Sequence, residues 1–452
     1  MSFKRGCFGG VLIMTLVFVA MFLIIFMGLA GVVSRTYHQA IIQSYDETAF
    51  QIAESGLDYG RWRLAHSGED FTEETREVKD QFAGTLGTYD VTFEPQAGSS
   101  IVLVESVGRT GNLPAREVTL RARYGMPSLA QYASLTNGDV WYGGEIHGPV
   151  HANGGIRMDG TSDSVVASAR ETYICQPAHG CNYEEKPGVW GTGELKELWE
   201  FPVPVVDYNA ITLDLLDMKS IAQAAGTYYD RSGVYGYHIV FNDNNTYAIY
   251  RVTSKGPKVW LWFPETGLKR DSYDIGQETL LEVRSVPSDG VIYTEDTLWV
   301  EGDIRDRISV AAGRFPDTPS SNEDIIINGN ISYGGVKDGT RSFGAVAQRH
   351  VLIPYSAAPD NLQLDGAFIA QKGRFGRHYY DSGAHRLKTS MVRYGMVASN
   401  FIPVTAWVDG SGQVISGYRQ GQSGYDPNLL YQPPPHFPTT GQYQFISWEE
   451  VE

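Results

Sequence analysis

The amino-acid sequence begins with a segment in which apolar residues follow one another almost without interruption. No charged residue occurs between Cys7 and Ser34, and the stretch from Val11 to Val33 is long and apolar enough to cross a bilayer as one helix. Lys4 and Arg5 precede this stretch, and few basic residues follow it closely. The charge distribution therefore predicts a single-pass protein of the cytoplasmic membrane, with its N-terminus in the cytoplasm and the large remainder outside.

After the span, the pattern changes from uniformly apolar to periodic. Residues 34–66 contain no proline, and small or apolar side chains recur at steps of three and four, as on one face of a helix. These side chains are Ile41, Tyr45, Ala49, Ile52, Ala53, Gly56, Leu57 and Gly60. One helix from about Cys7 to about Leu64 would be roughly 85 Å long at ~1.5 Å per residue, apolar in its first half and amphipathic in its second.

Two simpler interpretations compete with this long helix. A cleavable secretory signal peptide has a shorter apolar run and a small-x-small cleavage site soon after it, and the sequence shows neither. An ordinary membrane anchor explains the span, but it gives no reason for the helix to continue with one small, apolar face. A filament subunit gives such a reason, because its helix packs partly in a helical bundle and partly on its own globular domain.

Two motifs make the resemblance to a known family specific. Lys4-Arg5-Gly6 precedes the apolar run, and Ala49-Phe50-Gln51-Ile52-Ala53-Glu54-Ser55-Gly56-Leu57 lies in the amphipathic half. This region resembles the N-terminus of PilX-type minor pilins, which belong to type IV pili. The resemblance implies that prepilin peptidase cleaves after Gly6 and leaves Cys7 as the mature N-terminus. It also implies that Glu54 and Gly56 contribute to filament packing.

Val11 is a further filament-packing position, and it departs from the pattern of major pilins. In that family the fifth residue of the mature chain is a glutamate, which neutralises the N-terminal ammonium of a neighbouring subunit in the lipid or the filament core. An unpaired charge in such surroundings is costly. Valine at this position predicts a subunit that sits at the pilus tip or primes assembly and does not repeat along the shaft.

Beyond the helix, alternating apolar and polar residues predict short strands. Runs at Tyr89–Phe93, Ile101–Val107 and Arg116–Arg123 indicate a small antiparallel meander within residues 67–126, and the resemblance to pilins implies that it packs on the second half of the helix. Met126-Pro127-Ser128 marks a boundary. The fold class expected for the whole chain is therefore mainly β with a long N-terminal α-helix.

After this boundary an apolar-x-Gly-x-apolar pattern recurs between strand-like runs. Its copies are Ile146–Val150, Val300–Ile304, Ile327–Ile331 and Leu364–Phe368. Short strands that turn at glycine and stack on one another predict a parallel β-helix or a related solenoid, and a β-sandwich with glycine turns is the alternative.

Residues 206–285 interrupt this pattern. Helical spacing from Asp207 to Ala225 is followed by a hairpin of Tyr237–Phe241 and Tyr247–Val252, so we expect an α/β insertion. The expected domains are the helix 1–66 with its span 11–33, the meander 67–126, a β-rich domain in two parts (127–205 and 286–452, the second with a Pro-rich C-terminal segment), and the insertion 206–285.

Charge and cysteine content narrow the possible partners and cofactors. A net charge of −16, without a basic cluster beyond the first residues, disfavours nucleic acid as a partner. Cys175 and Cys181 enclose a five-residue loop that could close as a disulfide outside the cytoplasm. The alternatives are two free thiols and a metal site with His179, for which Cys-x3-His-x-Cys supplies only three ligands. We predict the disulfide, and neither a metal nor another cofactor.

The sequence offers little catalytic chemistry. It contains no Gly-x-Ser-x-Gly, Walker, His-Glu-x-x-His or Cys-x-x-Cys motif. Asp303, Asp306 and Asp365, and the pair His147 and His151, are interpreted as turn residues. We therefore expect a pilus component that is not an enzyme, with other pilins and pilus assembly proteins as partners and an outer domain for surface contact. The alternative is a membrane-tethered β-helix that binds or cleaves polysaccharide.

Overall fold

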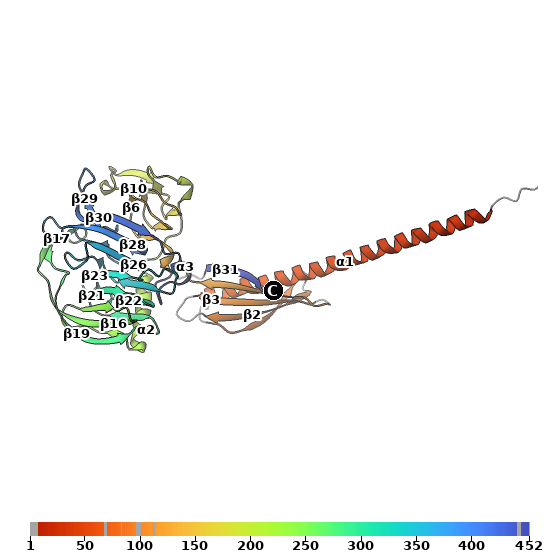
Figure 1. The fold of residues 1–452 in the computed structure, drawn as a ribbon, viewed down its shortest axis with the longest axis horizontal. Helices are drawn as coiled ribbons and strands as arrows, with labels where there is room; N and C mark the ends of the chain where they lie inside the picture. The colour runs from red at the N-terminus through yellow and green to blue at the C-terminus, as the bar shows by residue number, and fades with distance from the viewer. Residues whose placement is uncertain are drawn as a thin grey trace, which may run out of the picture. The chain divides into compact units, whose positions relative to one another are not determined.

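The structure is a computed structural model that describes residues 8–66, 70–82, 84–95, 101–111, 114–440 and 444–451. The chain forms two compact units (Figure 1). The first unit comprises residues 1–96, 101–125 and 443–452, and the second comprises residues 97–100 and 126–442. The predicted fold class is confirmed: the chain is mostly β, with one long N-terminal helix, a small antiparallel sheet and a large multi-stranded β unit.

Helix α1 (Phe8–His66) is continuous, as the absence of proline predicted. Its side chains from Leu12 to Ala40 are all exposed, and by length and composition this helix can cross a membrane. Its second half is different, because Ala49, Ile52 and Leu57 are buried. The two halves therefore differ in what they contact: the first half is free of the rest of this chain, and the second half belongs to a folded core.

That core is closed by one antiparallel sheet. β1 (Glu74–Lys79), β2 (Thr85–Pro95), β3 (Ile101–Thr110) and β4 (Glu117–Gly125) follow one another as a meander. β31 (Gln444–Val451) pairs antiparallel with β4 at the edge, and Figure 1 shows it in blue beside the orange strands. The meander was predicted. Sequence analysis did not identify β31 as its fifth strand.

Helix and sheet approach each other closely at two glycines. A Cβ atom on Gly56 would lie 2.1 Å from the hydroxyl oxygen of Ser106 on β3. A Cβ atom on Gly108 would lie 2.4 Å from the backbone oxygen of Ala49 and from the backbone nitrogen of Ala53. Real contacts are never this short, so only glycine permits the backbone of α1 to rest on β3.

The second unit is built from parallel ladders of short strands. One ladder runs, in spatial order, through β20 (Val291–Thr294), β22 (Arg307–Ala312), β24 (Ser342–Ala347), β26 (Asn361–Ala370), β28 (Leu387–Ser399), β5 (Ser134–Thr136), β7 (Val150–Ala152), β9 (Val166–Ser168) and β13 (Trp199–Glu200). Stacked parallel strands match the predicted solenoid and differ from the alternative sandwich, whose sheets are antiparallel.

Two further ladders form other sides of the solenoid, and we call one turn of the chain through the ladders a rung. One runs through β15 (Tyr237–Phe241), β21 (Leu298–Asp303), β23 (Ile325–Ser332), β25 (Val351–Leu352) and β27 (Phe375–Gly376). The other joins the first parts of β26 and β28 to β30 (Val414–Gly424), and β6 (Val140–Tyr142), β8 (Ile156–Met158) and β12 (Val189–Trp190) form a separate three-stranded sheet.

The recurring glycines lie where a rung changes direction. Gly302 and Gly366 have φ angles of 124° and 143°, which glycine adopts far more readily than other residues. A Cβ atom on Gly366 would lie 2.8 Å from the backbone oxygen of Phe343 on the preceding rung. In these two copies of the pattern, the glycine permits both the bend and the close stacking.

The predicted helix and hairpin are present. α2 (Ile211–Ala225) buries Ile211, Leu215 and Met218 against the outer side of the first ladder. β15 pairs antiparallel with β16 (Thr246–Lys255), which pairs in turn with β19 (Ile275–Ser285). β15 also pairs in parallel with β21, so this region continues the solenoid.

Candidate functional site

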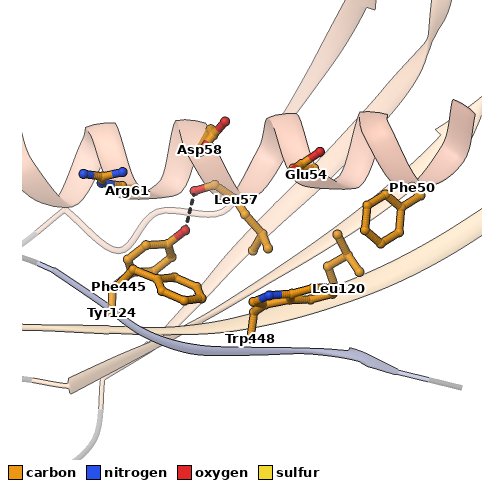
Figure 2. A pocket seen from close by; sticks show the side chains of 9 residues that line it. All are labelled: Phe50, Glu54, Leu57, Asp58, Arg61, Leu120, Tyr124, Phe445 and Trp448. Carbon is orange, nitrogen blue, oxygen red and sulfur yellow. Dashed lines mark hydrogen bonds between the residues drawn. The ribbon is translucent and has the colours of Figure 1, made fainter. Parts of the chain in front are cut away.

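The first unit has an open groove between α1 and the last strand of its sheet, which we call the α1–β31 groove (Figure 2). Its cavity measures about 230 Å³. The lining residues are Phe50, Glu54, Leu57, Asp58 and Arg61 of α1, Leu120 and Tyr124 of β4, and Phe445 and Trp448 of β31. The groove exists because β31 extends the sheet past the edge of the helix, so that one side of α1 remains uncovered.

The helix presents charged residues along this groove. Glu54, Asp58 and Arg61 are exposed and follow one another at helical spacing, so they share one face. Leu57, one residue before Asp58, points inward, and its carbonyl oxygen accepts a hydrogen bond of 3.3 Å from the hydroxyl of Tyr124 (Figure 2). Burial raises the pKa of Tyr124 to about 12, so this hydroxyl stays protonated and donates at neutral pH.

Aromatic side chains form the opposite wall. Trp448 meets Phe50 edge-on at 6.0 Å between ring centroids, and Phe445 meets Tyr124 at 5.8 Å. Phe445 and Trp448 remain 48% and 53% exposed on an edge strand. Exposed aromatic rings beside a charged helix face are typical of protein-binding surfaces, where such rings supply much of the binding energy.

The predicted filament-packing residues occupy different places. Glu54 lies at the groove, whereas Gly56 faces β3 of its own unit. Val11 lies within α1, but its side chain is outside the described residues, as are Gly6 and Cys7. Of the predicted packing residues whose side chains the structure describes, Glu54 is exposed and Gly56 is buried.

Cys175 and Cys181 are bonded to each other in the structure, with 5.6 Å between their Cα atoms. The loop between them turns back through Gly180, which has a left-handed φ of 76°. His179 is buried, and its carbonyl oxygen accepts a 2.6 Å hydrogen bond from Arg157. Within the described part of the chain, no group of three or more His, Cys, Asp or Glu residues is arranged to hold a metal ion.

The two histidines near the first glycine pattern do not converge. His147 is partly exposed and lies 2.7 Å from the carboxylate of Asp163, while His151 is buried beside Asn153. Asp365 is also buried, and its carboxylate accepts a hydrogen bond from the backbone N–H of Tyr333. These residues act within turns and rungs.

The two other aspartates interpreted as turn residues, Asp303 and Asp306, make equally local contacts. Asp303 ends β21, and the side chain of Asp306 accepts a 2.8 Å hydrogen bond from the N–H of the next residue, Arg307. This is the behaviour of a turn aspartate.

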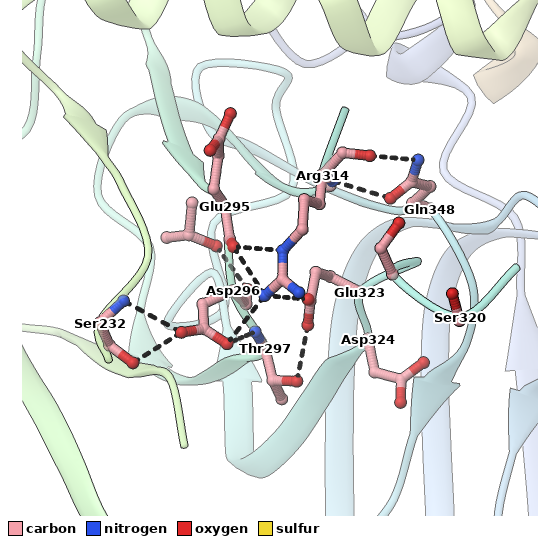
Figure 3. A network of polar contacts seen from close by, with 12 residues as sticks. Ser232, Glu295, Asp296, Thr297, Arg314, Ser320, Glu323, Asp324 and Gln348 are labelled. Carbon is pink, nitrogen blue, oxygen red and sulfur yellow. Dashed lines mark hydrogen bonds and ion pairs between the residues drawn. The ribbon is translucent and has the colours of Figure 1, made fainter. Parts of the chain in front are cut away.

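A network of charged residues lies at one corner of the solenoid (Figure 3). The guanidinium of Arg314 pairs with Glu323 at 2.5 Å and lies 3.7 Å from Asp296, and the backbone N–H of Arg314 donates to the side-chain oxygen of Gln348. Burial raises the pKa of Glu323 to about 7, although Arg314 acts in the opposite direction. Each of these side chains already has a protein partner, so the network holds the corner together and leaves no open group for a ligand.

No protein-family model, no curated protein and no solved structure matches this chain.

Proposed function

We propose that the protein is a minor pilin of the PilX kind. It is held in the cytoplasmic membrane by α1 and is then incorporated into a type IV pilus together with other pilins. The observation that carries this proposal is the continuous helix Phe8–His66, whose first half is exposed and apolar and whose second half packs on a five-stranded sheet. A plain anchor needs neither the extension nor the glycine contacts that fix the helix to β3.

The α1–β31 groove supports the same proposal, because it provides a surface to which a neighbouring pilin can bind. A neighbouring pilin offers an apolar side chain to Phe445 and Trp448 and charged groups to Glu54, Asp58 and Arg61. The hydrophobic contacts give affinity, and the charges set the register between subunits. The second unit then provides a surface for external contacts.

N-terminal mass spectrometry of the protein isolated from its host envelope tests the proposal. Prepilin peptidase should leave a mature chain that begins at Cys7. The variant Gly6→Leu should keep Met1, because the junction is altered, whereas Gly10→Leu, which lies beyond the junction, should still be processed. An intact Met1 in the native protein would contradict the pilin assignment.

The position within the pilus follows from Val11. A subunit at the tip has no neighbour ahead of it whose ammonium needs a carboxylate, so valine removes a desolvation cost without losing a partner. Immunogold labelling of purified filaments should place the second unit at filament ends. Gold spaced along the shafts would contradict the tip position and would leave the pilin assignment intact.

A further inference from the structure

The solenoid is continuous on one side and interrupted on another. β28 pairs in parallel with β5, which joins the rungs of residues 387–399 to the rungs that begin at residue 134. On the adjoining side, β30 pairs with β28 and with β29 (Ala406–Val408), and β6 pairs, within the described residues, with β8 alone. β30 and β6 therefore each leave a strand edge without a partner, where a continuous ladder would join them.

A cleft lies between these two edges. Two adjoining cavities of about 280 and 430 Å³ share their lining at the loop after β6 and at the end of β30. The shared residues are Gly144, Glu145, Arg393, Gly421, Gln422 and Ser423. We call this feature the β6–β30 cleft. It lies entirely within the second unit and does not depend on the pilin proposal.

Three glycines of the cleft are not required by the fold. A Cβ atom on Gly143, Gly144 or Gly421 would meet no atom within 4 Å, and none of the three has a left-handed φ. Gly421 lies inside β30, where glycine weakens a strand. Neither packing nor backbone conformation explains these residues. Because these glycines have no side chain, another chain can come close to the backbone N–H and C=O groups of the two walls.

Arg393 supplies an unpaired positive charge at the same place. It is half-buried on β28, its Nε atom is fully buried without a hydrogen-bond partner, and none of the described residues forms an ion pair with it. The acidic residue of the lining, Glu145, lies 3.5 Å from His147. A buried arginine nitrogen without a hydrogen-bond partner is costly, and an external carboxylate would relieve that cost.

The aromatic rings of the cleft are already engaged. Trp141 donates its indole N–H to Asp159, and the guanidinium of Arg157 covers its ring at 4.5 Å. Lys337 stacks over Tyr394 at 3.6 Å. Each of these two rings already carries a cation over one face, whereas the strand edges and Arg393 have no such partner among the described residues.

We propose that the β6–β30 cleft binds an extended, acidic peptide segment of a partner protein. The peptide backbone pairs with the free strand edges, and one of its Asp or Glu carboxylates pairs with Arg393. Strand addition provides affinity through main-chain hydrogen bonds, and the arginine selects the acidic side chain.

The full chain in lipid nanodiscs can be tested against a library of eight-residue peptides built from Val, Thr, Ser and Glu. Retained peptides should be rich in Glu. In fluorescence anisotropy, Arg393→Gln should weaken a retained peptide at least tenfold, and replacing its Glu by Gln should have a similar effect. Gly421→Val should weaken the acidic and the neutral peptide alike, because its side chain enters the cleft that Gly421 lines.

Arg419→Gln is the matched control for Arg393→Gln, because Arg419 is an exposed arginine of the neighbouring strand β30 that does not line the cleft. It should leave the affinity unchanged. Gly421→Val also keeps the test valid if Arg393→Gln alters the melting temperature, since a Cβ atom at this position would meet no atom within 4 Å. The proposal is overturned if no peptide is retained, if neither cleft variant changes the affinity, or if oligogalacturonate binds at Arg393 in place of peptides.

Discussion

The two β regions of this protein follow different rules of assembly. In the first unit, β1 to β4 pair with their neighbours in sequence, and β2 and β3 alternate between buried and partly exposed side chains. In the second unit, strands pair with strands one rung away, and every residue of β24 is buried. A sheet with one solvent face shows its period in the sequence. A strand covered on both faces reads as a continuous apolar run.

The cover on the outer face of the second unit explains this difference. α2 packs on the first ladder, and the C-terminal segment reaches it as well, because a Cβ atom on Gly344 would lie 2.7 Å from the ring of Phe437. The rungs are therefore enclosed between the inside of the solenoid and this outer layer. This difference predicts that the stability of the first unit depends on how closely α1 fits its sheet. The stability of the second unit should depend on the contacts made by groups buried at its corners.

The largest effect is expected from Gly108→Val in the first unit. The new side chain would collide with the backbone of α1 at Ala49 and Ala53, which cannot move without lifting the helix. We expect a loss of about 3 kcal/mol in unfolding free energy. Hydrogen exchange should rise in peptides of the first unit only. Gly111→Ala is the control, since its Cβ would meet nothing closer than 3.4 Å.

The next effect concerns a corner of the second unit. Arg349 makes two hydrogen bonds, of 2.7 and 2.6 Å, to Asp324, which is 1% exposed. Arg349→Met leaves this carboxylate buried and unpaired and should cost about 2 kcal/mol, less than for a fully buried pair because Arg349 is partly exposed. Chemical denaturation measures this loss of unfolding free energy. The double variant with Asp324→Asn should recover part of the loss, and full additivity would contradict the pairing.

A similar loss of unfolding free energy is expected when the loop that Cys175 and Cys181 close in the second unit is opened. Alkylation of the exported protein without reduction, followed by peptide mapping, should leave both cysteines unlabelled. Replacing both by serine should cost about 2 kcal/mol, because the open loop gains chain entropy on unfolding. Free labelling of both thiols in the native protein would rule out the bond.

The smallest effect is a pH dependence at His238 on β15. Burial lowers the pKa of His238, but hydrogen bonds to Glu278 and Glu301 outweigh it and raise the pKa above 6.5. The protonated histidine therefore stabilises the second unit fully below pH 6.5, and this stabilisation is lost as the pH rises through the raised pKa of His238. The contribution is on the order of 1 kcal/mol.

His238→Gln should remove this part of the pH dependence in urea titrations between pH 6 and 9. The remaining slope includes Glu323, whose raised pKa of about 7 also reduces stability as the pH rises. An unchanged slope in the variant would show that His238 is not protonated in the folded protein.

Sequence reasoning succeeded where the signal is local. The continuous helix followed from an apolar span and a face at steps of three and four. The meander followed from alternation, and the hairpin of Tyr237–Phe241 from a turn between two short runs. The α1–β31 groove was out of reach, because two of its aromatic residues lie on a strand more than 300 positions from the strand it joins. Among its lining residues, Glu54 alone had been assigned a role in filament packing.

What the sequence by itself determined is the type of each element, because helical and strand periods are set by side chains within a few residues of one another. Only the tertiary structure decided which elements meet. β5 stacks on β28, so the chain enters its solenoid in the middle, and the unpaired edges of β6 and β30 arise from that order. Pairing between distant strands depends on complementary surfaces that exist only once the chain has folded, and no local pattern encodes their partner.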